Sequence, residues 1–208
     1  EVDKAKETLT VKAQALKKVR VAAAPKLCDA VTKQMSHLQM GSAQIELNFE
    51  DLPFEQWNKV GSTKIELMYK PSAQMTARPL RKIASGGEVS RVMLACKVVL
   101  GESDVCDTLV FDEVDAGVGG ATAVALAEVL AQLAKTHQVI VVTHLPQVAV
   151  MASKQYVVSK TEEHNALPVT SLTEVSGTQR EEEIARMLSG SITEASLAHA
   201  HELLSEVR

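Results

Sequence analysis

Apolar residues recur with a helical period along the first 38 positions of the chain. Over residues 5–23 they are spaced alternately four and three apart, which is the spacing of a coiled-coil seam. The seam positions are Ala5, Leu9, Lys12, Leu16, Val19 and Ala23, of which only Lys12 is polar. Because proline inside a helix favours a kink, Pro25 divides the segment, and we predict a coiled-coil stub joined to a docking helix over residues 1–38. The alternative is an ordinary surface helix, since period alone cannot separate the two.

Two segments with period-two alternation follow, at residues 45–49 and 65–69. Alternation of this kind predicts half-buried strands. The loop between them contains Pro53 and Gly61, so we expect the two strands to pair as antiparallel neighbours.

The remainder of the chain alternates predicted helices with short runs rich in valine and isoleucine. Helices are expected at 87–100, 119–135, 146–152, 179–189 and 193–207, and strands at 108–112, 138–143, 155–160 and 169–175. Strands that alternate with helices usually pair in parallel, and we expect the strand at 169–175 at an edge. The fold class predicted is α/β, with a mostly parallel sheet flanked by helices. We place residues 1–38 in one domain and residues 39–208 in a second.

Three polar motifs stand at the ends of these predicted elements. Ser85-Gly86-Gly87-Glu88 opens a helix, Asp112-Glu113 ends a buried strand, and His144 ends the next strand. An Asp at a strand end suits Mg²⁺, which takes oxygen ligands and keeps several waters. A Glu directly after it can activate one of those waters.

Each motif alone has a structural explanation. Ser85 and Glu88 have the spacing of a helix capping box, an Asp-Glu pair can be a solvated strand end, and a single His can be a hydrogen-bonded structural residue. Their occurrence together, each in a consistent strand, turn or helix context, is more specific than any one of them. The combination indicates nucleotide hydrolysis.

The motifs resemble those of the ABC-type ATPases. SGGE is similar to the signature motif, the strand ending in Asp112-Glu113 to Walker B, Val114-Asp115-Ala116-Gly117 to the D-loop, and Thr143-His144 to the switch histidine. The longer strings IASGGEVSR, FDEVDAGVGG and VTHLPQVA resemble a group of bacterial DNA-repair proteins related to the SMC proteins. The resemblance covers nearly the whole chain and is to the C-terminal part of that family.

The resemblance implies an ATPase that uses Mg²⁺ and a role for each residue. Asp112 would hold Mg²⁺, Glu113 would orient or deprotonate the attacking water, and His144 would contact the γ-phosphate. Asp115 would reach across a dimer interface. The signature turn would bind ATP held by the other subunit of a homodimer, because helix N-termini attract anions. Its residues are Ser85, Gly86, Gly87 and Glu88.

One expected motif is missing from the sequence. A phosphate-cradling P-loop needs G-x-x-x-x-G-K-[ST], and none of the 10 glycines is followed by lysine. In the family resembled, the P-loop lies in an N-terminal lobe beyond a long coiled coil. We therefore expect the chain to be a fragment or one part of a split ATPase, with an N-terminal P-loop lobe as its partner. Alone, it should be inactive.

Composition adds little about partners. The net charge of −4 gives no whole-chain footprint for nucleic acid, so DNA as a partner comes from the resemblance alone. The 3 cysteines lack the spacing of a metal or redox motif. No apolar run reaches the roughly 20 residues needed to cross a bilayer, so we expect no membrane partner and a bacterial cytoplasmic, nucleoid-associated protein.

Two other functions stay open at this point. The nucleotide-binding domain of an ABC transporter would carry P-loop and signature in one contiguous chain. A non-enzymatic coiled-coil scaffold can keep an ATPase-like fold, although the intact pair Asp112 and Glu113 argues against it. A P-loop upstream in the complete gene product would distinguish these functions.

Overall fold

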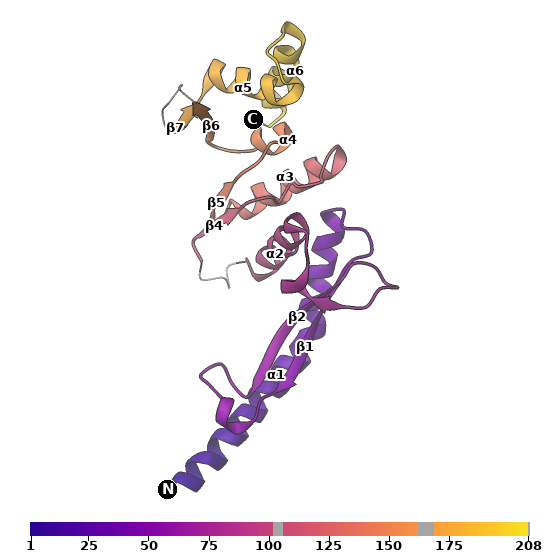
Figure 1. Ribbon diagram of the computed structural model, residues 1–208, viewed down its shortest axis with the longest axis vertical. Helices are drawn as coiled ribbons and strands as arrows, with labels where there is room; N and C mark the ends of the chain where they lie inside the picture. Colours follow the sequence, from indigo (N-terminus) through magenta and orange to yellow (C-terminus); the bar gives the residue numbers. More distant parts are fainter. Residues whose placement is uncertain (102–105, 162–168, 208) are drawn as a thin grey trace. The chain divides into compact units, whose positions relative to one another are not determined.

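A computed structural model of the chain describes residues 1–101, 106–161 and 169–207. The chain forms two compact units, which divide between Val105 and Cys106. Figure 1 shows the elements of each unit. The expected boundary at residue 38 stays a prediction.

A single long helix, α1 (Val2–His37), opens the first unit and continues through Pro25. The sequence predicted helix over residues 1–38, and this is confirmed; the kink expected at Pro25 stays a prediction. Most of the first half of α1 is exposed, whereas Val31 and Met35 in the second half are 1% and 0% exposed. The second half is therefore the part that packs on a core, as the sequence predicted.

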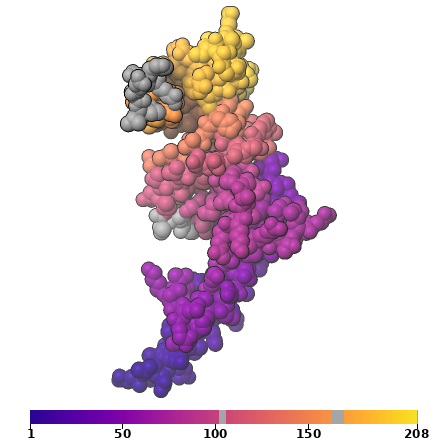
Figure 2. All heavy atoms as spheres, viewed as in Figure 1, coloured from indigo at the N-terminus to yellow at the C-terminus, as the bar shows by residue number. Residues whose placement is uncertain are grey.

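Two antiparallel strands lie against α1, as the spacing of alternating residues predicted. Strands β1 (Gln44–Asp51) and β2 (Thr63–Lys70) pair over their whole length, and the short β3 (Arg78–Pro79) adds to β2. A 3₁₀ turn, η1 (Phe54–Gln56), lies in the loop between β1 and β2. Figure 2 shows the atoms of this hairpin lying along α1.

Helix α2 (Gly86–Leu100), which follows the 3₁₀ turn η2 (Leu80–Lys82), completes the first unit. It packs against α1 and buries Val92 and Leu94 completely. Burial raises the pKa of the Cys96 thiol to about 11 and also raises the pKa of Cys28 on α1. Both thiols therefore stay protonated at neutral pH, as expected for structural cysteines.

The second unit begins with two parallel strands, β4 (Thr108–Phe111) and β5 (Gln138–Val141), joined by α3 (Ala121–Leu133). The α/β class that the sequence predicted is confirmed in this unit. The strand at 155–160 does not join the parallel pair, which corrects the prediction. Instead β6 (Gln155–Thr161) pairs with β7 (Val169–Val175) in an antiparallel hairpin. The second half of β6 is polar and exposed, which does not suit a strand buried on both faces.

Three helices form a separate small core at the end of the chain. They are α4 (Pro146–Ala149), α5 (Gly177–Ser189) and α6 (Glu194–Glu206). Ile184, Ala185 and Ala200 are fully buried where α5 meets α6. Within this core, the Arg180 side chain connects α5 to the end of α4. Its Nη2 donates to the carbonyls of Ala149, Val150 and Ala152 at 3.1, 3.1 and 2.8 Å, so one side chain binds three carbonyls at and beyond the C-terminal end of the short helix.

Replacing Arg180 with Ala should destabilise the second unit. The change removes charge-assisted hydrogen bonds worth about 1.5–3 kcal/mol each and leaves the α4 carbonyls without this donor, so we expect a net loss of about 2–3 kcal/mol. Urea unfolding followed by circular dichroism measures it. Arg186→Ala is the matched control, because Arg186 is exposed and its pair with Glu183 is a surface i,i+3 contact, worth under about 0.5 kcal/mol. Equal losses in the two variants would show that Arg180 does not anchor α4.

Candidate nucleotide-hydrolysis site

The signature turn lies in the first unit, at the start of α2. The Ser85 hydroxyl oxygen accepts a hydrogen bond from the Glu88 backbone N–H at 3.3 Å, so Ser85 caps the helix. Ser85 and Gly86 are exposed, and Gly87 is buried. The structural explanation of Ser85 is thus realised. It leaves room for a ligand role, because a helix start still offers unpaired N–H groups to an anion.

The carboxylate pair follows β4 in the second unit. The strand ends at the buried Phe111, Asp112 and Glu113 are exposed, and Val114 is fully buried. Glu113 has φ = +57°, a left-handed conformation that is unfavourable for any residue except glycine. The chain turns sharply here, and the Ala116 N–H donates to the Glu113 carbonyl at 3.1 Å. The turn presents the Glu113 carboxylate to solvent, and no sequence signal indicated its strained backbone.

His144 lies at the end of the neighbouring parallel strand. Because β4 and β5 are parallel and in register, from Thr108 beside Gln138 to Phe111 beside Val141, their carboxyl ends meet at one edge. The structure therefore brings His144 to the same edge as Asp112 and Glu113. The His144 side chain is 71% exposed.

Asp115 connects the two strand ends. Asp115 is only 3% exposed. Its Oδ2 accepts hydrogen bonds from the Thr143 hydroxyl at 2.6 Å and from the His144 backbone N–H at 3.0 Å. The same oxygen lies 3.1 Å from His144 Nδ1. The carboxylate is thus engaged within its own lobe. The expected contact across a dimer interface stays a prediction.

The donor set suits Mg²⁺ in a nucleotide site. Among the residues that the structure describes, there is no group of three or more His, Cys, Asp or Glu side chains able to enclose a metal. Magnesium seldom needs one, since it is usually held by one or two carboxylates, waters and substrate phosphates. Asp112, exposed at a strand end, fits that single-carboxylate role. Over the same residues, no helix is long and apolar enough to span a membrane.

No protein-family model matches the chain, but individual relatives do. "DNA repair protein RecN" of Streptomyces coelicolor is 40% identical over 94% of this chain and 36% of its own length. The RecN protein of Deinococcus radiodurans is 43% identical over 92% of this chain and 33% of its own length. The chain therefore spans about a third of these relatives.

Solved structures agree on the fold. An Smc head domain with a coiled coil and joint from Pyrococcus yayanosii matches with a TM-score of 0.60 at 17% identity, over 90% of this chain and 34% of that one. A chain from a study of "ATP-driven dimerization and DNA stimulated activation of SMC ATPases" matches with a TM-score of 0.50 at 19% identity, over 83% of this chain and 98% of that one.

Fold and site together define the class: this is an α/β lobe of the SMC-head type. The sequence relatives make the identification more specific. The chain is RecN-like, and it corresponds to about a third of a RecN protein, consistent with the C-terminal part.

The left-handed backbone at Glu113 predicts an unusual response to glycine. Because glycine adopts φ > 0 without penalty, Glu113→Gly should be more stable than Glu113→Ala by about 0.5–1 kcal/mol, the relief of strain less the added chain entropy. Thermal unfolding of both variants measures the difference. At Asp112, which is not among the positive-φ residues, the order should reverse, with glycine the less stable. The same order at both positions would contradict a strained Glu113.

Proposed function

We propose that the chain is the C-terminal ATPase lobe of a RecN-like, SMC-family protein of DNA double-strand break repair and recombination. The proposed lobe supplies signature motif, Walker B carboxylates and switch histidine for ATP-driven dimerisation of two heads. The observation that carries this proposal is the meeting of Asp112, Glu113 and His144 at the carboxyl ends of two parallel strands, at the edge where α/β sheets bind ligands.

Each residue has a proposed part in hydrolysis. Asp112 holds Mg²⁺, which neutralises charge on the transferring phosphoryl group. Glu113 accepts a proton from, or aligns, the attacking water, and its exposed carboxylate is free of the buried core. His144 contacts the γ-phosphate from the neighbouring strand end. The capped turn of Ser85, Gly86, Gly87 and Glu88 offers helix N–H groups to ATP bound by a second copy.

An N-terminal P-loop lobe is the proposed partner in each head. Over the residues that the structure describes, the parallel sheet of the second unit has two strands, and an isolated two-stranded sheet is at best marginally stable. Its cross-strand pair Val110 and Ile140 is 66% and 48% exposed, and Val142 beyond them is 58% exposed. An apolar sheet face of this kind needs covering strands or helices, and the relatives contain about twice as much additional chain. The sequence of this lobe has no P-loop lysine, so under this proposal it needs that partner for activity.

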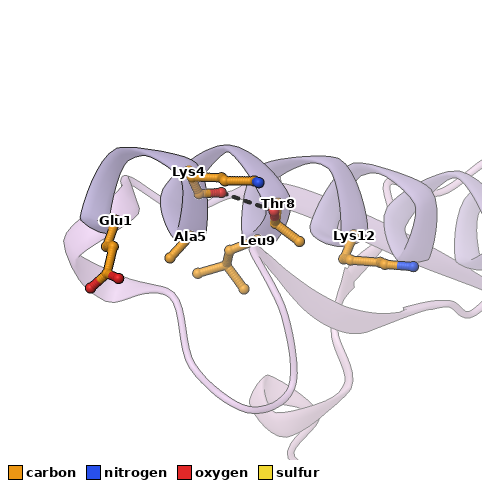
Figure 3. A pocket seen from close by; sticks show the side chains of 6 residues that line it. All are labelled: Glu1, Lys4, Ala5, Thr8, Leu9 and Lys12. Carbon is orange, nitrogen blue, oxygen red and sulfur yellow. Dashed lines mark hydrogen bonds between the residues drawn. The ribbon is translucent and has the colours of Figure 1, made fainter.

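The proposed DNA partner has a candidate surface on α1. Five lysines fall within an arc of about 120° on this helix, at 100° per residue. They are Lys4, Lys12, Lys18, Lys26 and Lys33, all of them exposed. None forms an ion pair with another residue in the part of the chain that the structure describes. Figure 3 shows Lys4 and Lys12 along a shallow groove at the start of the helix.

The other basic residues of α1 are occupied by the hairpin. Lys17 binds Asp51 at 2.6 Å, and the Arg20 guanidinium donates to the Val60 carbonyl at 2.7 Å. Lys6 lies over the Phe54 ring, 4.7 Å from its centre. The five-lysine face is therefore distinct from the face that packs. A basic face on a chain of net charge −4 supports binding to the phosphates of DNA. Under this proposal the protein acts in the bacterial cytoplasm, at the nucleoid.

A charge-reversal pair tests the lysine face. In the complete protein, Lys12→Glu with Lys26→Glu should weaken binding to duplex DNA and lower the slope of log K against log salt by about 2, since each phosphate contact adds about 0.9. Fluorescence anisotropy at several salt concentrations measures both quantities. Lys59→Glu with Lys135→Glu changes the net charge equally at exposed positions off α1. If both pairs alter the slope alike, general charge and not this face governs binding.

Replacing Glu113 with Gln tests the ATPase proposal directly. In the complete protein the variant keeps size and polarity but cannot take a proton, so turnover should fall by about 10²–10⁴-fold while ATP binding persists. Heads joined by ATP should then accumulate, which gel filtration with ATP detects. Near-normal phosphate release would remove Glu113 from this role. Loss of both turnover and ATP binding would instead favour a scaffold with an ATPase-like fold that this residue merely stabilises.

A further inference from the structure

The side chain of Asp115 is a buried carboxylate with several polar neighbours. Among the described residues its Oδ2 collects three groups: the Thr143 hydroxyl, the His144 backbone N–H and His144 Nδ1, at 2.6, 3.0 and 3.1 Å. A buried carboxylate without partners is unfavourable by several kcal/mol. Two hydrogen bonds, from the Thr143 hydroxyl and the His144 backbone N–H, therefore hold this carboxylate in its buried position beside the exposed His144 ring.

The hydrogen bonds have a defined direction. The Leu145 N–H donates to the Thr143 hydroxyl oxygen at 3.0 Å, so that hydroxyl uses its own proton toward Asp115. A carboxylate can only accept hydrogen bonds. His144 Nδ1 lies 3.1 Å from that acceptor oxygen, and a bare nitrogen lone pair so close to a carboxylate would be repelled. This contact favours a proton at Nδ1, because the group that faces one ring nitrogen sets the tautomer and ring orientation of a histidine. This leaves Nε2 as the ring atom presented outward.

We propose that Asp115 is a positioning residue that locks His144 as the Nδ1–H tautomer and aims Nε2 at the substrate phosphate. The inference rests on the proposed role of His144 as the γ-phosphate contact. Under this inference Asp115 acts within its own lobe, where its oxygen is hydrogen-bonded. The sequence-based expectation was a contact across a dimer interface. Only Val114, fully buried, separates Asp115 from Glu113. The same short segment thus sets the direction of both the water-activating carboxylate and the phosphate-contacting ring.

The tautomer is measurable without nucleotide. The chain is labelled with ¹⁵N-histidine, and long-range ¹H–¹⁵N spectra are recorded at a pH where imidazoles are neutral. The His144 signal is assigned by its loss in His144→Gln. We expect protonated Nδ1 at His144, whereas the exposed His199 should show the Nε2–H form that predominates in free histidine. An Nε2–H form at His144 in the unmodified chain overturns the inference, whatever the activity of any variant.

A double-mutant cycle on turnover tests the functional link in the complete protein. Asp115→Asn keeps the shape but loses the charge, and we expect kcat to fall by about 10- to 100-fold, the range for partners that orient a functional histidine. In a His144→Ala background the same change should have under about a 2-fold effect, because a residue that acts through another shows no separate contribution. Thermal unfolding in both backgrounds records any change in stability.

The outcomes separate the inference from the proposal beneath it. Suppose that His144→Ala lowers kcat and that Asp115→Asn lowers kcat by the same factor with and without it. The two residues then act independently, and the positioning role alone is overturned. Normal turnover by His144→Ala would instead show that the proposed γ-phosphate contact is wrong, and the positioning role would fall with it. A strong loss from Asp115→Asn that disappears in the His144→Ala background supports both.

Discussion

The parallel pairing of β4 with β5 is the interaction on which the candidate site depends. Antiparallel pairing would send the two strand ends in opposite directions and separate Glu113 from His144 by the length of the sheet. In parallel register, both strands release their polar residues at one edge, where Asp115 can bridge them. The helix that makes this register possible is α3, since parallel neighbours need a long crossover connection.

This pairing also leaves a sheet face that a second lobe would cover under the proposed function. Four-residue strands in a two-stranded sheet leave one face of the pair poorly covered, and apolar residues such as Val110 and Val142 stay exposed. The first unit shows a different solution, because its hairpin is held by ion pairs and hydrogen bonds to α1, including Lys17 with Asp51. The exposed apolar sheet face and the absence of a P-loop motif from the sequence agree with the proposed function. Both are expected of one lobe of a head whose other lobe would supply strands and phosphate-binding residues.

Sequence patterns predicted the elements well and their pairing less well. Period-two alternation at 45–49 and 65–69 correctly predicted the two strands of the hairpin, which extend over 44–51 and 63–70. The polar motifs were correctly predicted to follow the ends of strands. The pairing of β6 with β7 was missed because a run such as Tyr156-Val157-Val158 has the same composition in a hairpin as in a central strand. Helix over residues 1–38 was predicted correctly, and it continues through Pro25 because one lost hydrogen bond is outweighed by continuous helix on both sides. Pairing and continuity depend on contacts distant in sequence, which local patterns do not contain.

The turn after β4 contains two energetically unfavourable features, and each helps to explain the other. Glu113 has a left-handed backbone, and Asp115, two residues later, is a buried acid. An unconstrained turn would relax both, by moving Glu113 to a common conformation and Asp115 into water. The buried Val114 and the two hydrogen bonds to Asp115 hold the segment at its far end, so the chain reaches Asp115 from Phe111 only through a sharp turn. That turn is what directs the Glu113 carboxylate outward at the edge where His144 ends its own strand. The backbone strain at Glu113 is then a consequence of fixing the Glu113 carboxylate and the His144 ring at one edge of the sheet. A structure optimised for stability alone would have neither the strained turn nor the buried Asp115.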